Sequence, residues 1–170
     1  LQRWQPESLL ADCAVAAKPA DVGTWGDEQR WQQVYSLAGL DLPERRVRLT
    51  VSGQLSLPYF NAGVVAARKP EQFGPAWLAA TRQLHDCDLE IGERYPWLDQ
   101  IALPVAMAQQ ETWRGLDEAW NFPAHLRALG TADVNLCHYH HPGVILREPR
   151  LRHLFRKACK TLPYLADVAR

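Results

Sequence analysis

The densest group of chemically reactive side chains in the sequence is Cys137-His138-Tyr139-His140-His141. If this segment is a strand, His138 and His140 lie on one face, about 6–7 Å apart along the chain. Two imidazoles at that spacing can bind one divalent ion, or one can bind the ion while the other contacts a phosphate. The remaining ligands must then be carboxylates from elsewhere in the chain. The alternative is that these histidines are polar surface at a strand end, and the spacing alone does not decide between the two.

A pair of acidic residues, Asp86-Cys87-Asp88, has the spacing of carboxylates that hold Mg²⁺ or Mn²⁺ under a diphosphate. The pair lies in a polar and acidic stretch, residues 85–94, and does not follow an apolar strand. We therefore expect a solvated loop at this position and not a metal site.

Two further polar positions have the chemistry to contact a polyhydroxylated ligand. Asn61 and Gly63 interrupt the apolar run of residues 59–67, where the amide can donate and accept hydrogen bonds and the glycine allows close backbone approach. A β-bulge at the entry of a core strand is the alternative. Asp99-Gln100 begins an expected helix, so the carboxylate either caps that helix or reaches sugar hydroxyls in a cleft.

Six of the seven tryptophans divide into two groups by their surroundings. Trp31 and Trp77 fall on apolar helix stripes and are expected in the core. The others near turn signals are better candidates for a cleft wall, where an indole face can stack on the C–H face of a sugar. These candidates are Trp25, Trp97, Trp113 and Trp120.

The last 24 residues, 147–170, hold seven basic side chains and two acidic ones. An apolar stripe of residues 151, 154, 155, 158 and 162 predicts an amphipathic helix within this stretch. Such a helix can lie on an anionic membrane surface. The alternative is a solvated basic face on a helix that packs against the core.

Length and composition limit the class of protein to which these residues can belong. The 170 residues suit one domain with a sizeable core, and 19 basic residues balance 19 acidic ones. No basic field therefore points to nucleic acid as the main partner. No apolar run is long enough for a transmembrane helix. Four scattered cysteines without a CxxC motif indicate a reduced, cytoplasmic chain.

Hydrophobic periodicity predicts the elements that must position the candidate residues. Strands are expected at residues 13–17, 46–51, 59–67 and 134–139, with a short strand and turn in 113–122. Helices are expected around residues 31–38, 73–84, 98–105 and 151–162, and Pro104 should kink or split the third. Alternating strands and helices predict an α/β fold in which a mixed sheet is flanked by helices. We expect a single unit, residues 1–170, that is a piece of a larger domain.

Four segments, in this order, resemble the C-terminal part of a GT-A-fold nucleotide-sugar glycosyltransferase of the family 8 type. The family pattern is F-N-x-G-V, then D-Q, then an aromatic-Asn pair, then a hydrophobic-x-His-aromatic strand. The matching segments are Tyr59-Phe60-Asn61-Ala62-Gly63-Val64, Leu98-Asp99-Gln100, Glu118-Ala119-Trp120-Asn121-Phe122 and Leu136-Cys137-His138-Tyr139. The family's D-Q-x-x-L-N segment ends in Pro104 here, where the family has asparagine.

The resemblance implies a role for each matching residue. Asp99 would bind hydroxyls of the donor sugar, and Gln100 would lie below the anomeric carbon. His138 would be a protein ligand to Mn²⁺ or Mg²⁺, with His140 as a further candidate from the histidine cluster. The substrate-binding positions would be Asn61, Ala62, Gly63, Trp120 and Asn121.

The expected function is transfer of a sugar from a nucleotide-diphosphate donor to a glycan or lipopolysaccharide-type acceptor. No Asp-x-Asp precedes Tyr59, and the chain starts at Leu1 with Met107 as its one methionine, so we expect this piece alone to be inactive. Two alternatives stay open: a non-catalytic interaction or regulatory domain, and a small metal-binding protein built on His138, His140 and His141. We expect no nucleic-acid partner, self-association through an open sheet edge, and a cytoplasmic location with peripheral contact at the inner face of the membrane.

Overall fold

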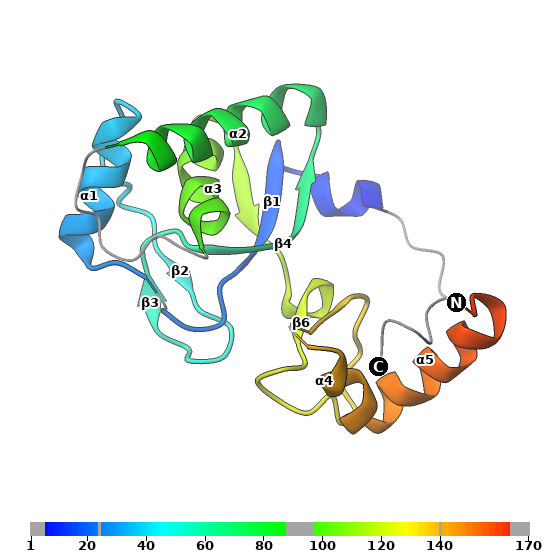
Figure 1. Cartoon of the computed structure of the whole chain (residues 1–170). Helices are drawn as coiled ribbons and strands as arrows, with labels where there is room; N and C mark the ends of the chain where they lie inside the picture. The colour runs from blue at the N-terminus through cyan, green and yellow to red at the C-terminus, as the bar shows by residue number, and fades with distance from the viewer. Residues whose placement is uncertain (1–5, 24, 88–96, 140, 164–170) are drawn as a thin grey trace. The chain divides into compact units, whose positions relative to one another are not determined.

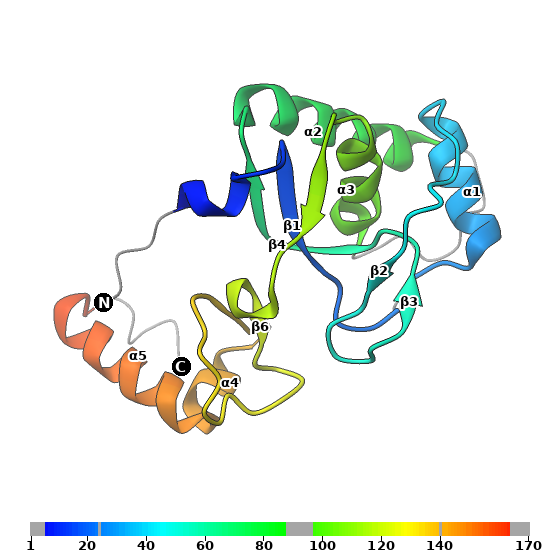
Figure 2. The same cartoon turned by 180° about the vertical axis from the view of Figure 1, so that it is seen from behind.

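The computed structural model describes residues 6–23, 25–87, 97–139 and 141–163. The chain forms two compact units, Leu1–Leu116 and Asp117–Arg170, and each is described by itself. The first unit holds a three-stranded sheet with three α-helices, and the second holds two short strands and two α-helices (Figures 1 and 2).

The sheet of the first unit has the strand order β4-β1-β5. The central strand β1 (Val15–Pro19) pairs antiparallel with β4 (Phe60–Ala67) and parallel with β5 (Trp113–Gly115). All five residues of β1 are buried, as expected for the middle strand of a covered sheet. This is the mixed α/β sheet that the sequence predicts, and the fold class is confirmed.

Three helices accompany this sheet. Helix α1 (Glu28–Leu37) begins after Asp27, whose side chain accepts the backbone N–H of Arg30. Helices α2 (Pro70–Asp86) and α3 (Leu98–Ala108) pack against each other and contact β4. A short 3₁₀ helix, η1 (Pro6–Leu10), contacts β1 and β4. The helical spacing in the sequence predicts all three α-helices.

Pro104 does not split α3, so that alternative of the prediction is wrong. The helix is continuous from Leu98 to Ala108, and every residue from Ile101 to Met107 is buried. A proline inside a helix costs about 3 kcal/mol. Burial of one large apolar side chain contributes about 1.5–3 kcal/mol, so the several buried around Pro104 outweigh that cost.

An aromatic cluster forms much of the core between α1 and the sheet. Trp31 contacts Trp25 edge-to-face at a centroid distance of 4.8 Å and Tyr59 at 5.7 Å. Trp31 is a core residue, as predicted. Trp25 is also buried, at 6% exposed, so its assignment to a cleft wall is wrong. Trp113 is half-buried at the edge strand β5, where the Arg45 guanidinium lies 3.8 Å from its ring centroid.

The predicted strand at residues 46–51 is shorter in the structure. Only β2 (Val47–Arg48) pairs, with β3 (Leu55–Ser56). Leu49 then donates to Gln54 O and Gly53 donates to Leu49 O, which closes a turn. Thr50 N–H donates to Ala20 O instead of extending the strand. The alternation in residues 46–51 reflects one buried face. Strand β2 ends early because the backbone N–H groups of Leu49 and Thr50 donate to Gln54 and Ala20.

The second unit consists of short elements. A 3₁₀ turn, η2 (Glu118–Trp120), precedes β6 (Phe122–Pro123), which pairs parallel with β7 (Cys137–His138). The predicted strand 134–139 is reduced to the two residues of β7, because its one partner β6 has two residues. Helices α4 (Pro142–Arg147) and α5 (Pro149–Thr161) follow. In the described part of the chain, no helix is both long enough and apolar enough to cross a membrane.

Candidate functional site at the carboxyl edge of the sheet

Topology brings several chain segments to one edge of the sheet in the first unit. The parallel strands β1 and β5 both end there, at Pro19 and Gly115, and the antiparallel strand β4 begins there, at Phe60. Helix α3 ends shortly before the start of β5. The beginning of α3 is therefore at the same end of the sheet as the ends of β1 and β5 (Figure 1). We call this the carboxyl edge. Ligands of open α/β sheets bind outside the carboxyl ends of parallel strands.

Strand β4 carries a large bulge at the carboxyl edge. Ala17 pairs with Val65 and Pro19 pairs with Phe60, so Lys18 alone faces a longer stretch of β4. That stretch is Asn61, Ala62, Gly63 and Val64. An irregularity of this kind bends a strand and redirects side chains. The bulge that the sequence offers as an alternative at Asn61 and Gly63 is therefore present.

Inside the bulge, the side chain of Asn61 makes a local turn. Its Oδ1 accepts the backbone N–H of Gly63 at 2.8 Å. Asn61 is buried, Ala62 is half-buried and Gly63 is exposed. The turn therefore presents the backbone around Gly63 to solvent, where a ligand hydroxyl has access to it.

Below the bulge lies a buried ion pair that reasoning from sequence missed. Lys18 is fully buried, and its Nζ contacts Asp21 Oδ1 and lies 3.2 Å from Thr50 Oγ1. Thr50 Oγ1 donates to Asp21 Oδ1 at 2.7 Å. Val51 and Ser52 donate their backbone N–H groups to Asp21 O, both at 3.0 Å. This network ties the end of β1 to the turn after β2. The sequence signal is a lysine directly after an apolar run, with an aspartate three residues later.

At the start of α3, Asp99 does not act as the helix cap. The cap position is Trp97 and makes no side-chain hydrogen bond, and Asp99 is inside the first turn. The Asp99 carboxylate is exposed and has no partner among the described residues, while its carbonyl accepts Trp77 Nε1 at 2.9 Å. Gln100 is half-buried. A carboxylate in the first turn is favoured by the helix dipole and stays available to accept hydrogen bonds.

The remaining predicted site residues lie in the second unit. Trp120 is half-buried in η2 and Asn121 is buried at 2% exposed. His138 is half-buried in β7, and its ring contacts the ring of His125 edge-to-face with centroids 5.6 Å apart. The sequence gives no signal for His125, because this residue is 13 positions before His138 and outside the histidine cluster.

The predicted ligands to Mn²⁺ or Mg²⁺ are only partly among the described residues. No group of three histidine, cysteine or acidic side chains converges in the described ranges. His141 Nδ1 accepts Gly143 N–H at 3.0 Å and so caps α4. Burial raises the pKa of the Cys137 thiol, which disfavours the thiolate that binds metals. His140 and Asp88 lie outside the described residues.

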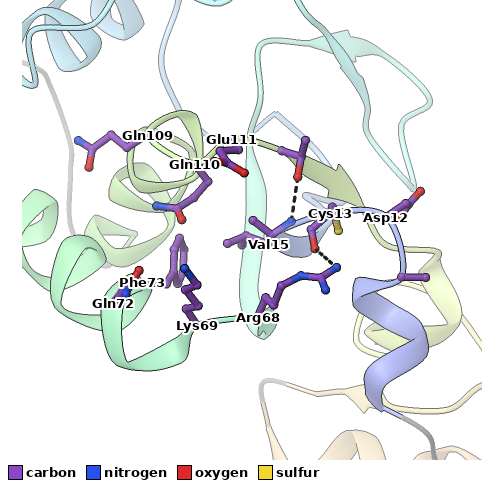
Figure 3. Close-up of a pocket in the computed structure, with 13 residues that line it drawn as sticks. Asp12, Cys13, Val15, Arg68, Lys69, Gln72, Phe73, Gln109, Gln110 and Glu111 are labelled. Carbon is purple, nitrogen blue, oxygen red and sulfur yellow. Dashed lines mark hydrogen bonds between the residues drawn. The ribbon is translucent and has the colours of Figure 1, made fainter.

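A pocket of about 520 Å³ lies at the opposite edge of the sheet, between the starts of β1 and α2 and the end of β4 (Figure 3). Its charged lining residues are Asp12, Arg68, Lys69 and Glu111. Arg68 there donates to the carbonyls of Leu10 and Cys13. Asn61 is the second residue of β4, and Arg68 directly follows its last residue, Ala67, so the two residues are at opposite ends of the strand. The pocket is therefore distinct from the carboxyl edge.

This geometry defines a class of protein: an α/β domain whose carboxyl edge presents a bulged strand and an exposed carboxylate. Residues 2–111, more than half of the chain, match the Rhodobacterales glycosyltransferase domain family. The chain belongs to this family. The predicted glycosyltransferase class is confirmed, and the assignment to family 8 stays a prediction. No curated protein and no solved structure matches the chain significantly. The matched residues include Asn61, Asp99 and Gln100, and end before Trp120.

Proposed function

We propose that the protein transfers a sugar from a nucleotide-diphosphate donor to a hydroxyl of a glycan or lipopolysaccharide-type acceptor, on the cytoplasmic side of a membrane. The observation that carries this proposal is the polar carboxyl edge inside the family-matched region. It combines the bulge at Asn61–Gly63 with the exposed carboxylate of Asp99.

In this proposal the chain's own residues bind and orient the sugar. The Asp99 carboxylate accepts hydrogen bonds from two sugar hydroxyls, since a carboxylate offers two acceptor oxygens. The backbone around Gly63 contacts the ring closely, because glycine has no side chain to exclude it. Gln100, one residue further along α3, lies below the anomeric carbon, where its amide oxygen stabilises the positive charge that develops on that carbon. Positioning of this kind lowers the barrier without covalent chemistry by the protein.

Dependence on Mn²⁺ or Mg²⁺ remains a separate proposal. His138, with its neighbour His125, is the described position that could contribute a nitrogen ligand. The test is to measure transfer by the full-length protein after chelation and after adding back each metal. Restoration by Mn²⁺ or Mg²⁺ that is lost in His138→Ala would support the proposal, and undiminished transfer after chelation would refute it.

The test of the proposed function uses the two ends of α3. The full-length protein is assayed with a panel of nucleotide sugars for release of nucleoside diphosphate and for labelled product. Asp99→Asn should lower kcat/KM about 100-fold, because the substitution removes the charged acceptor that holds the sugar hydroxyls up to the transition state. Glu111→Gln is the matched control, since Glu111 is an exposed carboxylate just past the other end of the helix. Its kcat/KM should stay within about twofold.

Two outcomes would overturn the proposal. One is that no nucleotide sugar of the panel is consumed. The other is that Asp99→Asn and Glu111→Gln alter kcat/KM equally, which would mean that the carboxyl edge has no special role. Far-UV circular dichroism of both variants establishes that the fold is retained.

A further inference from the structure

Helix α5 of the second unit separates its apolar and basic residues onto different faces. At about 100° per residue, its leucine, phenylalanine and alanine side chains fall within a sector about 100° wide. These residues are Leu151, Leu154, Phe155 and Ala158. The basic side chains occupy the rest of the circumference. These are Arg150, Arg152, Arg156, Lys157 and Lys160.

The rest of the described chain covers the apolar face of α5 only in part, since Leu151, Phe155 and Ala158 are half-buried and Leu154 is exposed. No residue of the helix is buried, and Leu154 is 58% exposed. Leu162, which follows the helix, is 43% exposed. Of the nine large hydrophobic side chains that are exposed in the described residues, six belong to the second unit. Leu154 and Leu162 are therefore apolar side chains that α5 and the residue after it present to solvent.

The charge on α5 is of one sign. Pro149–Thr161 contains five basic residues and no acidic one. Arg150 is already engaged, because its guanidinium donates to Gly130 O at 3.0 Å and Ala132 O at 2.8 Å and so ties the helix start to its own unit. The other four cations have no hydrogen-bond or ion-pair partner among the described residues. They are Arg152, Arg156, Lys157 and Lys160.

We propose that α5 lies flat on an anionic lipid surface, with its apolar face at the level of the acyl chains and its cations at the lipid phosphates. A lipid surface supplies both complements at once, since it is anionic at the headgroups and apolar beneath them. Arg152 and Lys157 border the apolar face on its two sides, where long side chains reach the headgroups. A second copy of α5 is a poorer complement, because two apolar faces would meet with cations beside cations.

The experiment is co-sedimentation of the full-length protein with vesicles at about 0.1 M salt. Vesicles of phosphatidylcholine with about 30% phosphatidylglycerol should bind the protein, and vesicles of phosphatidylcholine alone should not. Raising the salt to about 0.5 M should weaken binding at least tenfold. The triple variant Arg156→Gln, Lys157→Gln, Lys160→Gln should weaken it about 100-fold, at roughly fivefold for each cation. Leu154→Ser should weaken it as well, without disturbing a core because Leu154 is mostly exposed.

A charge-matched control separates a site on α5 from the effect of net charge. Arg30, Lys69 and Arg82 are exposed in the first unit, and their side chains have no partner among the described residues. The triple variant Arg30→Gln, Lys69→Gln, Arg82→Gln should retain most of the vesicle binding. Equal weakening by both triple variants, binding that does not depend on phosphatidylglycerol, or a dimer in light scattering that Leu154→Ser converts to a monomer would each overturn the proposal.

Discussion

The buried lysine of β1 permits a quantitative test of how the carboxyl edge is held together. Replacing Lys18 by methionine keeps a long unbranched side chain but removes the ammonium that contacts Asp21. Lys18 is fully buried, and the side chain of Asp21 is 8% exposed. Water therefore cannot take the place of the missing partner, and the carboxylate is left with the hydroxyl of Thr50 at 2.7 Å.

The expected loss follows from those contacts. Breaking a buried ion pair by removing one partner costs about 3–5 kcal/mol. The surviving hydrogen bond from Thr50 to a charged acceptor contributes about 1.5–3 kcal/mol, which keeps the cost at the lower end. We expect Lys18→Met to lower the free energy of unfolding by about 3 kcal/mol. Lys18→Met combined with Asp21→Leu should lie within about 1 kcal/mol of the unmodified protein, because no unpaired charge remains.

Urea unfolding followed by tryptophan fluorescence measures this directly. Trp25 and Trp31 are in edge-to-face contact in the core of the same unit, so their emission reports unfolding of that unit. A loss of less than about 1 kcal/mol in Lys18→Met, or a double variant as unstable as the single one, would contradict a stabilising ion pair between Lys18 and Asp21.

Further measurements should give the following results. The hydroxyl of Tyr35 is buried with no hydrogen-bond partner among the described residues, so Tyr35→Phe should raise the free energy of unfolding by about 1 kcal/mol. Burial also raises the pKa of the Tyr35 phenol above its ordinary value of 10.0. The phenol therefore ionises first in the unfolded state, and the free energy of unfolding falls as the pH rises above 10. Urea titrations at pH 9 to 11 should show this fall in the unmodified protein and not in Tyr35→Phe. Gly26→Ala should cost more than Gly39→Ala in thermal unfolding, because both have positive φ angles (75° and 68°) but an added Cβ at Gly26 meets the Trp31 ring at 3.1 Å, and equal costs would contradict this. Light scattering at high concentration should detect self-association through the edges of the three-stranded sheet, and a monomer would count against it.

Local periodicity in the sequence predicts most of the first unit. The spacing of Trp31, Val34 and Tyr35 predicts α1, and Asp27 is its observed cap. The apolar run of residues 59–67 predicts β4 to within one residue. These elements are predictable because each buries one continuous face, which the sequence records as a repeat.

Features that depend on distant residues are the ones that local patterns miss. The burial of Lys18 depends on Thr50, 32 residues away, and the early end of β2 depends on backbone bonds to Ala20 and Asp21. Pro104 stays inside α3 because every residue from Ile101 to Met107 is buried, which a local rule about proline does not predict.

The candidate site is predictable in part. Asn61, Asp99 and Gln100 lie at the carboxyl edge, where the resemblance to glycosyltransferases implies a sugar site, and their roles there remain predictions. Trp120, Asn121 and His138 lie in the other unit. The ring contact of His138 with His125 depends on the parallel pairing of β6 and β7. Strands of two residues are too short to show a hydrophobic repeat, so the sequence does not predict this pairing.

The bulge in β4 has a consequence for how this chain can change over evolution. The pairs Ala17–Val65 and Pro19–Phe60 set the register independently on the two sides of residues 61–64. Insertions and deletions between these anchors therefore alter the bulge and leave the pairing of the sheet unchanged. Loops change length at small thermodynamic expense, whereas a slip within a regular strand would turn every side chain to the wrong face. Length variation among relatives should thus concentrate at residues 61–64, where it alters the shape offered to a substrate and spares the scaffold.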